Sequence, residues 1–288
     1  MLHEIFRVGK PIITALHLPP LPGSLRFKGN LEEIIEFSVT QARILEESGA
    51  DGIIIENYND YPYPKRLRNP ITLAAMTTIV REVVKEVSIP VGVNVLRNSS
   101  IESYCIAYAT GAKFIRVNAF VEVLVTDSGT IEPTSQDLAP IRAQYPGIKV
   151  FADILCKHGA SLSYTTLLNQ LRALNWMGIS AENAPRKALE VIIKDAEERG
   201  LADALIVTGT RTGESPDLNL VKTVKKLSKV PVIIGSGLTP ENIENYLKIA
   251  DGAIVGSYIR KDGKAGNPID RERLKRFMRA VKEAHQKI

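Results

Sequence analysis

The chain has 288 residues, of which 44% are hydrophobic and 24% are charged, and its formal net charge is +5. This composition is ordinary for a globular protein with a sizeable core, and it excludes an intrinsically disordered chain. The basic residues are spread along the chain and are not interleaved with aromatic residues in one dense stripe, so we predict no nucleic-acid partner.

Targeting and redox features are absent from the sequence pattern. The N-terminus lacks the apolar core of a signal peptide, and no run approaches the roughly 18 apolar residues of a membrane span. We therefore expect a cytoplasmic protein without a transmembrane segment. Cys105 and Cys156 fit neither a metal-ligand spacing nor a disulfide framework. We expect Cys105 in the core, and Cys156 lies near the candidate site, where a nucleophilic role is a minor alternative.

The first third of the chain predicts strands that alternate with helices. Apolar runs too short for helices predict strands at 11–17, 51–56 and 89–96. Asn30 is expected to cap a helix that ends at Gly49. The expected buried side of that helix carries Leu31, Ile35, Val39 and Ala42. A polar loop follows the second strand and holds three tyrosines that we expect to face a ligand, namely Tyr58, Tyr61 and Tyr63, and a helix from about 72 to 87 comes next.

The middle third contains the least regular connections. Strands are predicted at 114–119 and 149–153, and the chain between them is longer than a common connection. Within it, Asp127–Gly129 predicts the turn of a hairpin. We expect this hairpin, at residues 121–135, to form a lid over the ends of the strands. Residues 161–180, with the apolar segment 167–176, predict an extra helix or an oligomer contact.

The last third repeats the same alternation. A helix is predicted from 184 to 199 and strands at 203–208, 230–235 and 251–255. Ser215 and Thr239 each precede a proline, and we expect both to cap helices with the proline at the first helical position. The buried face of the final helix is predicted to carry Leu274, Phe277, Met278 and Val281.

Repeated Ala-Asp-Gly-Ile-like and Ile-Pro-Val-like segments mark the starts of these strands, and eight βα units can be counted. The sequence therefore predicts an α/β protein that forms a single (β/α)8 TIM barrel over residues 1–288. A doubly wound sheet is the rival, but its glycine-rich fingerprint should follow the first strand, where this chain is rich in proline.

Glycine-containing breaks follow the predicted seventh and eighth strands, and they predict a phosphate-binding site at the C-terminal face of the barrel. Glycines let backbone N–H groups approach an anion, and a helix beginning just beyond adds its positive end. The predicted phosphate-binding residues are Gly235, Ser236, Gly237, Gly256 and Ser257, together with Gly209 after the sixth strand.

Strand alternation selects the side chains that face the barrel interior. The outer face of a barrel strand must be apolar to meet its helices, so polar residues of the other parity point inward. This places Glu56, Asn94, Arg116, Asn118 and Asp153 inward, toward the ends of their strands. His17 ends the first strand, where parity is less decisive.

These inward residues predict acid–base chemistry. Glu56 and Asp153 are the candidate general base and acid if Arg116 and burial separate their pKa values. Lys157 and His158 follow strand five and offer a proton donor or an amine nucleophile. The structural alternative is a satisfied polar plug in which Arg116 bridges both carboxylates. The predicted substrate-binding residues are His17, Asn94, Asn118, Asp127, His158, Thr208 and Arg211. Ordinary turn chemistry is the alternative for Asp127, Thr208 and Arg211.

A divalent metal site is the alternative for the same region. His17, Glu56, Asp153 and His158 are the residues that would bind a divalent cation, but no H-x-x-x-H or similar spacing supports one. The sequence requires no cofactor, and we predict no metal ligands.

Several blocks of the chain together resemble the BtpA/SgcQ family. They include HLPPLPGS at 17–24, GVNVLRN at 92–98, FIRVN at 114–118 and IIGSGLTPEN at 233–242, and further blocks lie at 126–129, 157–158 and 200–209. The resemblance runs from about Ile12 to Pro268 and departs from the family pattern at 161–180. It implies a phosphate-binding barrel of unsettled activity, with some members associated with photosystem I biogenesis at the thylakoid and others with sugar metabolism.

Two hypotheses follow. The first is an enzyme that acts by proton transfer, as an isomerase or lyase, on a phosphorylated sugar or nucleotide-like compound. The second is a non-catalytic factor for the biogenesis or stability of a membrane protein complex, which leaves peripheral membrane association open. Inward ionisable residues favour the enzyme, and in either case we expect a homo-oligomer.

Overall fold

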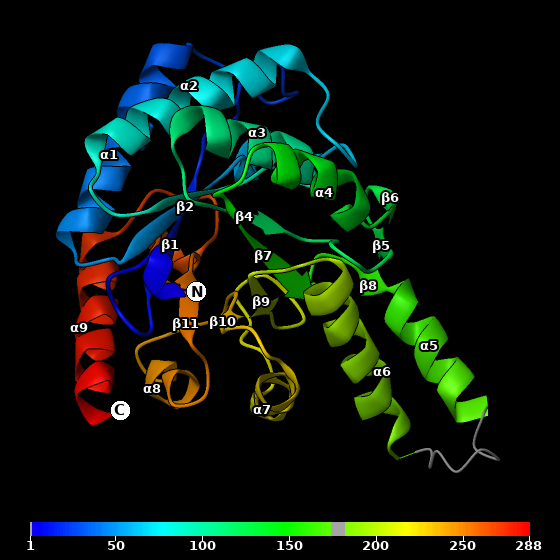
Figure 1. The fold of residues 1–288 in the computed structure, drawn as a ribbon. Coiled ribbons are helices and arrows are strands. Elements are labelled where there is room, and N and C mark those ends of the chain that lie inside the picture. The colour runs from blue at the N-terminus through cyan, green and yellow to red at the C-terminus, as the bar shows by residue number, and fades with distance from the viewer. Residues whose placement is uncertain (1, 174–181) are drawn as a thin grey trace.

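Eight parallel strands close into a barrel in the computed structural model, which describes residues 2–173 and 182–288 (Figure 1). The strand order around the barrel is β1-β11-β10-β9-β7-β4-β3-β2, which confirms the predicted fold and excludes the doubly wound sheet. The barrel strands are β1 (Ile12–His17), β2 (Gly52–Glu56), β3 (Val91–Asn94), β4 (Phe114–Val117), β7 (Lys149–Ile154), β9 (Ala204–Val207), β10 (Val232–Ile234) and β11 (Gly252–Val255).

Helices surround this barrel and cover the outer, apolar side of its strands (Figure 1). The sequence pattern did not single out α3 or α4, whose amphipathic periodicity is weak. The helices are α1 (Leu31–Glu47), α2 (Pro70–Glu86), α3 (Ser100–Thr110), α4 (Ser135–Gln144), α5 (Leu162–Ala173), α6 (Ala184–Lys194), α7 (Leu218–Leu227), α8 (Ile243–Leu247) and α9 (Arg271–Lys287). None of the helices within the described ranges is long and apolar enough to cross a membrane.

A second apolar cluster fills the barrel interior toward the amino-terminal ends of the strands. The Phe114 ring stacks on Phe151 with centroids 4.8 Å apart, and Phe6, from the segment before β1, lies 5.7 Å from Phe114. Gly92 makes room for this stack, because a Cβ there would lie 2.2 Å from the Phe114 ring. The aromatic rings therefore close the barrel at the amino-terminal ends of its strands. The buried polar side chains, such as Glu56, Arg116 and Asp153, lie toward the carboxyl-terminal ends.

A small antiparallel sheet lies beside the barrel. It contains β5 (Leu124–Thr126), β6 (Gly129–Ile131) and β8 (Ala160–Ser161), in the order β6-β5-β8. The hairpin forms where the sequence predicted it, and its pairing with β8 links it to the segment that follows β7.

Helix α5 projects away from the barrel beside α6 (Figure 1). None of its described residues is buried. The predicted extra helix is thus present from Leu162 to Ala173, whereas residues 174–176 of the predicted apolar segment lie outside the described residues.

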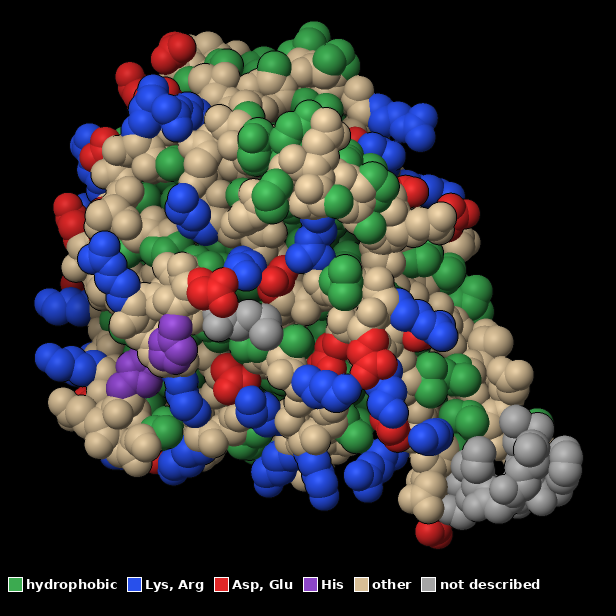
Figure 2. All heavy atoms as spheres, in the orientation of Figure 1, with side chains coloured by type: hydrophobic (Ala, Val, Ile, Leu, Met, Phe, Trp, Pro, Cys, Tyr) green, Lys and Arg blue, Asp and Glu red, His purple; other side chains and the backbone are tan. Residues whose placement is uncertain are grey.

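One local prediction about packing is wrong. Cys105 is exposed on α3, beside the exposed Tyr108, and apolar side chains are visible over the region of α3 and α4 in Figure 2.

The predicted apolar side of α1 faces the core. Ala42 is fully buried, and Leu31, Ile35 and Val39 are partly buried and pack against the core cluster. Ile34 and Leu45 widen this buried side, because a barrel helix also packs against its neighbouring helices.

The predicted helix starts also need correction. Asp217, not Ser215, caps α7, because its carboxylate accepts the N–H groups of Asn219 and Leu220 at 2.8 and 3.0 Å. The segment at Thr239 forms a turn, and α8 begins only after Asn242 and has five residues. A charged side chain satisfies two terminal N–H groups at once, which explains the shift in α7. The short α8 offers little dipole support for an anion.

Candidate functional site

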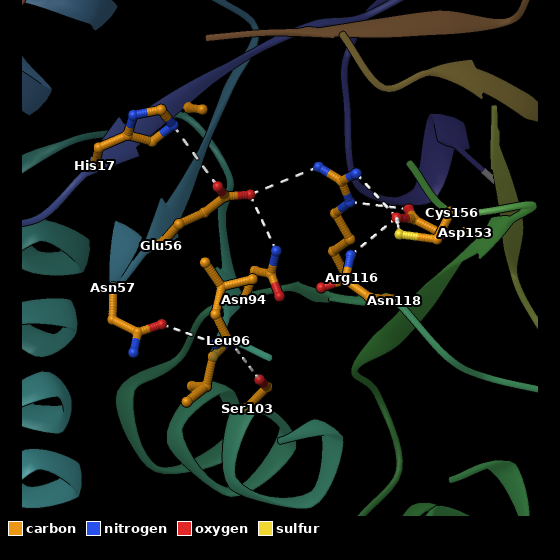
Figure 3. A network of polar contacts seen from close by, with 12 residues as sticks. His17, Glu56, Asn57, Asn94, Leu96, Ser103, Arg116, Asn118, Asp153 and Cys156 are labelled. Carbon is orange, nitrogen blue, oxygen red and sulfur yellow. Dashed lines mark hydrogen bonds and ion pairs between the residues drawn. The ribbon is translucent and has the colours of Figure 1, made fainter. Parts of the chain in front are cut away.

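Polar side chains from the ends of four neighbouring strands, β2, β3, β4 and β7, meet inside the barrel (Figure 3). Arg116 donates from Nε and Nη2 to the two oxygens of Asp153 at 2.9 and 3.0 Å, and its Nη1 lies 3.6 Å from Glu56 Oε1. Asn118 donates to Asp153 at 2.8 Å and Asn94 donates to Glu56 at 3.0 Å. All five side chains point inward, as strand alternation predicted.

Asp153 is enclosed by its partners. Its side chain has no exposed surface, and it accepts bonds from Arg116, from Asn118 and, at 3.0 Å, from the Cys156 thiol. Burial, and then the neighbouring carboxylate, raises the pKa of Cys156 well above its ordinary value, which disfavours a nucleophilic thiolate. Burial opposes the charge of Arg116, but Asp153 outweighs it and raises the pKa of the guanidinium. These contacts match the alternative of a satisfied polar plug, in which Arg116 bridges Asp153 and Glu56.

His17 lies beside Glu56 at the mouth of the barrel. Its Nδ1 accepts the Gly266 N–H at 3.0 Å, and its Nε2 lies 3.6 Å from Glu56 Oε2. The ring stacks on Tyr58, with centroids 4.3 Å apart. Burial, and then the charge of Arg260, lowers the pKa of His17 well below its ordinary value, so the imidazole is neutral near pH 7. The pair is therefore a contact between a neutral ring and a carboxyl group.

The segment after β7 directs Lys157 and His158 toward the same region. Leu155 has φ of 50°, in the left-handed region that a leucine rarely adopts, and its N–H donates to Glu122 at 2.9 Å. The Lys157 N–H donates to Thr208 Oγ1 at 3.0 Å, which links this segment to the end of β9. The fold thus holds a strained turn at the point that positions the two basic side chains, a feature common at functional sites.

Burial and nearby cations change the protonation of both residues. Desolvation, and then Arg116, lowers the pKa of Lys157 to about 8. Desolvation, and then Lys157, lowers the pKa of His158 well below its ordinary value. At neutral pH the site therefore contains a neutral His158 and a lysine with a substantial neutral fraction.

A central cavity of about 30 Å³ brings most of the predicted site residues together. This is room for about one water molecule, so protein atoms largely fill the strand ends. Tyr58 and Thr212 also line it. The predicted residues that line this cavity are His17, Glu56, Arg116, Lys157, His158, Gly235, Ser236, Gly256 and Ser257.

A second cavity, of about 180 Å³, lies between the loops that follow β10 and β11. The backbone segments Gly237–Thr239 and Gly256–Ser257 line it, and Gly256 and Ser257 also line the central cavity. The two cavities therefore meet at one edge. This is the position at which the sequence predicted a phosphate.

Arg273 lines the second cavity and was not predicted. Its Nε donates to the Tyr258 carbonyl at 2.6 Å, and its guanidinium lies 4.4 Å from the centre of the Tyr258 ring. No carboxylate of the described ranges forms an ion pair with it. Its position in the first turn of α9, where the helix dipole disfavours a cation, is the one sequence signal that could have identified it.

Arg260 is a second residue near the site that the sequence pattern did not identify. It is 1% exposed, and it donates from Nη1 to Asn267 O and from Nη2 to Ala15 O, while its Nε has no partner. Burial lowers the pKa of Arg260 to about 10, so the side chain is still charged at neutral pH. The nearby charge of Glu56 opposes this decrease in pKa without cancelling it.

Two of the predicted phosphate glycines are in contact with the chain's own loop. A Cβ at Gly237, where φ is +74°, would lie 2.0 Å from Ser215 N, and a Cβ at Gly209 would lie 2.3 Å from Glu214 O. Ser236 Oγ also donates to Glu214 O at 3.1 Å. Packing against residues 210–215 thus explains Gly209 without a ligand, while Gly237 still borders the second cavity.

Two other predicted residues lie away from the central cavity. Asp127 pairs with Arg97 at 2.7 Å, and the neighbouring Ser128 Oγ donates to Tyr63 O at 2.8 Å. These contacts fasten the hairpin to the tyrosine-containing loop; that the hairpin serves as a lid stays a prediction. Arg211 is exposed.

The alternative metal site would use His17, Glu56, Asp153 and His158. Within residues 2–173 and 182–288, no group of three or more His, Cys, Asp or Glu side chains is arranged to hold a metal ion, so the alternative metal site gains no support.

A cavity of about 700 Å³ lies at the opposite, amino-terminal face, among Arg7, Asp51, Lys113 and Lys149. It lies at the beginnings of the strands, away from the polar network.

Comparison with known proteins supplies the context for this site. The family model described as "BtpA family" matches residues 8–174 and 178–283. An uncharacterized protein of Pyrococcus abyssi is 43% identical over 274 residues, covering 95% of this chain and 96% of its own. The photosystem I biogenesis protein BtpA of Synechocystis is 36% identical over 284 residues, covering 98% and 91%.

Solved structures support the fold. The chain aligns with (S)-3-O-geranylgeranylglyceryl phosphate synthase from Thermoplasma acidophilum, which was solved with its substrate sn-glycerol-1-phosphate. The TM-score is 0.52, the sequence identity is 16%, and the alignment covers 96% of this chain and 95% of the other. At that identity the likeness is one of fold alone.

Proposed function

The chain belongs to the BtpA family, and from the chemistry of its own site we propose that it is an enzyme acting on a phosphorylated small molecule. The phosphate would occupy the second cavity, against Gly237–Thr239, Gly256–Ser257 and Arg273. The reacting carbon would reach the central cavity, where Glu56 and Lys157 are positioned to transfer protons in an isomerase or lyase reaction.

The observation that carries this proposal is the excess of cationic side chains. Within the described residues, the partners of partly buried Arg273 are a carbonyl and an aromatic ring, and the hydrogen bonds of buried Arg260 go to carbonyls, while the charge of Glu56 acts on it from a longer distance. A buried charge without a counterion is costly, and the cost is offset when an anion binds. A phosphate ester in the second cavity would supply that negative charge and could also accept bonds from the backbone N–H groups of the glycine-containing loops.

The other predicted residues would have supporting roles. Arg116 would fix the Glu56 carboxyl, and Asp153, enclosed below it, would position Arg116 rather than exchange protons itself. Asn94 and Asn118 would hold the same two carboxylates, and Thr208 would hold the Lys157 backbone. His17 and His158, both neutral, would offer hydrogen bonds to substrate hydroxyl groups.

Thermal unfolding tests the phosphate site. We expect sn-glycerol 3-phosphate to raise the Tm of the protein, and glycerol to leave it unchanged, because only the former carries the anion. A ligand at a hundred times its Kd stabilises by about 2.7 kcal/mol. Arg273→Gln should weaken binding by about 10- to 100-fold, as expected for loss of a charge-assisted hydrogen bond.

Matched variants separate binding from folding. Arg276→Gln removes an exposed cation of the same helix and should leave the ligand response unchanged. Gly256→Ala adds a Cβ whose nearest neighbours lie at ordinary contact distances of 3.5–3.7 Å, so it should fold but narrow the junction of the two cavities. Equal responses of wild type and both site variants would rule out the proposed phosphate position.

The alternative is a non-catalytic factor in the biogenesis of a membrane protein complex. The name of the 36% identical Synechocystis relative and the nearly filled strand ends favour it. In that case no phosphorylated compound should alter the Tm, and the Arg273 and Gly256 variants should behave like wild type in every ligand titration.

A further inference from the structure

Lys157 is a partly buried lysine that forms no ion pair with any residue of the described ranges. No carboxylate in the described part of the chain lies within ion-pair distance of its Nζ, although Glu56 lines the same cavity and Asp153 lies below. Arg116, close enough to disfavour a second positive charge, is itself held by those two carboxylates. Burial and Arg116 therefore give this lysine a larger neutral, nucleophilic fraction than an ordinary lysine has.

The backbone around Lys157 is arranged to hold that amine in place. The left-handed turn at Leu155 is held by Glu122, and the Lys157 N–H is held by Thr208. Strain of this kind costs about 1–3 kcal/mol and persists only where the surrounding structure imposes it. Here its result is that Lys157 faces the cavity that borders the phosphate region at Gly256–Ser257.

We propose that Lys157 forms a Schiff base with the carbonyl carbon of a short phosphorylated aldehyde or ketone whose phosphate occupies the second cavity. This inference rests on the proposed function and narrows its substrate class to carbonyl compounds. A short chain is required because the central cavity, at about 30 Å³, admits only a small reacting group.

The chemistry of this step balances without a cofactor. The neutral amine adds to the carbonyl carbon, and a proton moves from nitrogen to the former carbonyl oxygen to give a carbinolamine. That hydroxyl then leaves as water after accepting a second proton through the Glu56 carboxyl, and a C=N⁺ bond to Lys157 remains. The iminium withdraws electrons from the adjacent carbon, so Glu56 could then remove a proton there, as an isomerase or lyase requires.

Borohydride trapping tests this inference on the intact protein. Dihydroxyacetone phosphate and glycolaldehyde phosphate are the probes, and sn-glycerol 3-phosphate, which lacks a carbonyl, is the matched negative. Peptide mass spectrometry should find a reduced adduct on Lys157, with one adduct per chain. With a pKa of about 8, roughly a tenth of the Lys157 amines are neutral at pH 7, which is about 300 times the fraction of an ordinary lysine, so labelling should strongly favour Lys157.

Two variants control for charge and for indiscriminate labelling. Lys157→Arg keeps the positive charge and should abolish the adduct while still showing the Tm increase with sn-glycerol 3-phosphate. Lys222→Arg, which changes an exposed lysine of α7, should leave trapping at Lys157 unchanged.

The outcomes distinguish this inference from the function on which it rests. A Tm increase with all three compounds but no adduct on Lys157 would overturn the Schiff base and leave the phosphate site standing. An adduct spread over surface lysines, with equal yield in Lys157→Arg, would overturn it too. If no phosphorylated compound changes the Tm and none is trapped, the proposed function itself fails.

Discussion

At the scale of single residues, Arg116 connects the two carboxylates at the centre of the site. Its guanidinium is bidentate on Asp153 and lies 3.6 Å from Glu56. Removing one partner of a buried ion pair leaves an uncompensated charge, so Arg116→Ala should lower the free energy of unfolding by about 3–5 kcal/mol. Denaturant titration measures this change.

Two comparisons make that prediction specific. Arg276→Ala breaks an exposed pair with Glu241, with side chains 59% and 62% exposed, and should cost less than about 1 kcal/mol. The double variant Arg116→Met with Asp153→Leu removes both charges and should recover much of the loss. A single variant as stable as wild type would mean that Asp153 does not depend on Arg116.

Buried His17 and partly buried His158 predict the acid sensitivity of the protein. Their folded-state pKa values are depressed, so the unfolded chain binds more protons than the native protein as the pH falls below about 6.5. Their contribution to stability is therefore complete above that pH and is lost on acidification. His17→Gln should lose less stability between pH 7 and pH 5 than wild type does.

Thermal unfolding as a function of pH measures this difference. At pH 8 the histidine is neutral in both the folded and unfolded states, so any change in Tm there reports altered packing and serves as the reference. Parallel curves for wild type and His17→Gln from pH 8 to pH 5 would show that His17 does not supply the acid sensitivity.

At the scale of elements, the barrel interior depends on a glycine opposite a ring. A Cβ at Gly92 in β3 would lie 2.2 Å from Phe114, and the rings below leave Phe114 little room to move. Gly92→Ala should therefore destabilise by about 1–3 kcal/mol, the range for overpacked cores. Calorimetry or denaturant titration measures the loss.

The control for this prediction is an open glycine. Gly9→Ala meets no heavy atom nearer than 3.9 Å and should be close to neutral. Adding Phe114→Leu to Gly92→Ala should restore part of the stability, because the smaller side chain frees the space. Additive losses in the double variant would show that the ring is not the cause.

The same elements show what strand alternation can and cannot predict. The side chains of a barrel strand that face its helices must be apolar. The alternation of side chains along each strand therefore sufficed to identify Glu56, Arg116 and Asp153 as inward. Arg260 and Arg273 follow the last strand, in a loop and in a helix, where no such rule applies. The filling of the strand ends by the loop at 210–215 also escaped the sequence, because it depends on packing between segments distant in the chain.

At the scale of the whole molecule, the barrel and its appendage differ in burial. The barrel strands are buried throughout, apart from Lys149 at the start of β7, whereas α5 has no buried residue. Local stability follows burial, so amide hydrogens of α5 should exchange far faster than those of β1 or β4. Hydrogen exchange with mass spectrometry on the dilute native protein measures this.

The same experiment examines the predicted homo-oligomer. If α5 contacts a second copy, its protection should increase with protein concentration while that of β1 stays constant. Slow exchange of α5 at every concentration would contradict the assignment of α5 to the least stable part of the structure.

Closure of the barrel has a consequence for how the protein is made. β1 pairs with β2 and also with β11, and the Arg260 guanidinium bonds to the Ala15 carbonyl across 245 positions of sequence. At a translation rate of about 5–20 residues per second, β11 is synthesised about 10–50 s after β1, and one edge of β1 stays unpaired during that time. An unpaired strand edge is a template for aggregation throughout that interval. A chain truncated before β11 would therefore keep one edge of β1 unpaired and could not close its barrel.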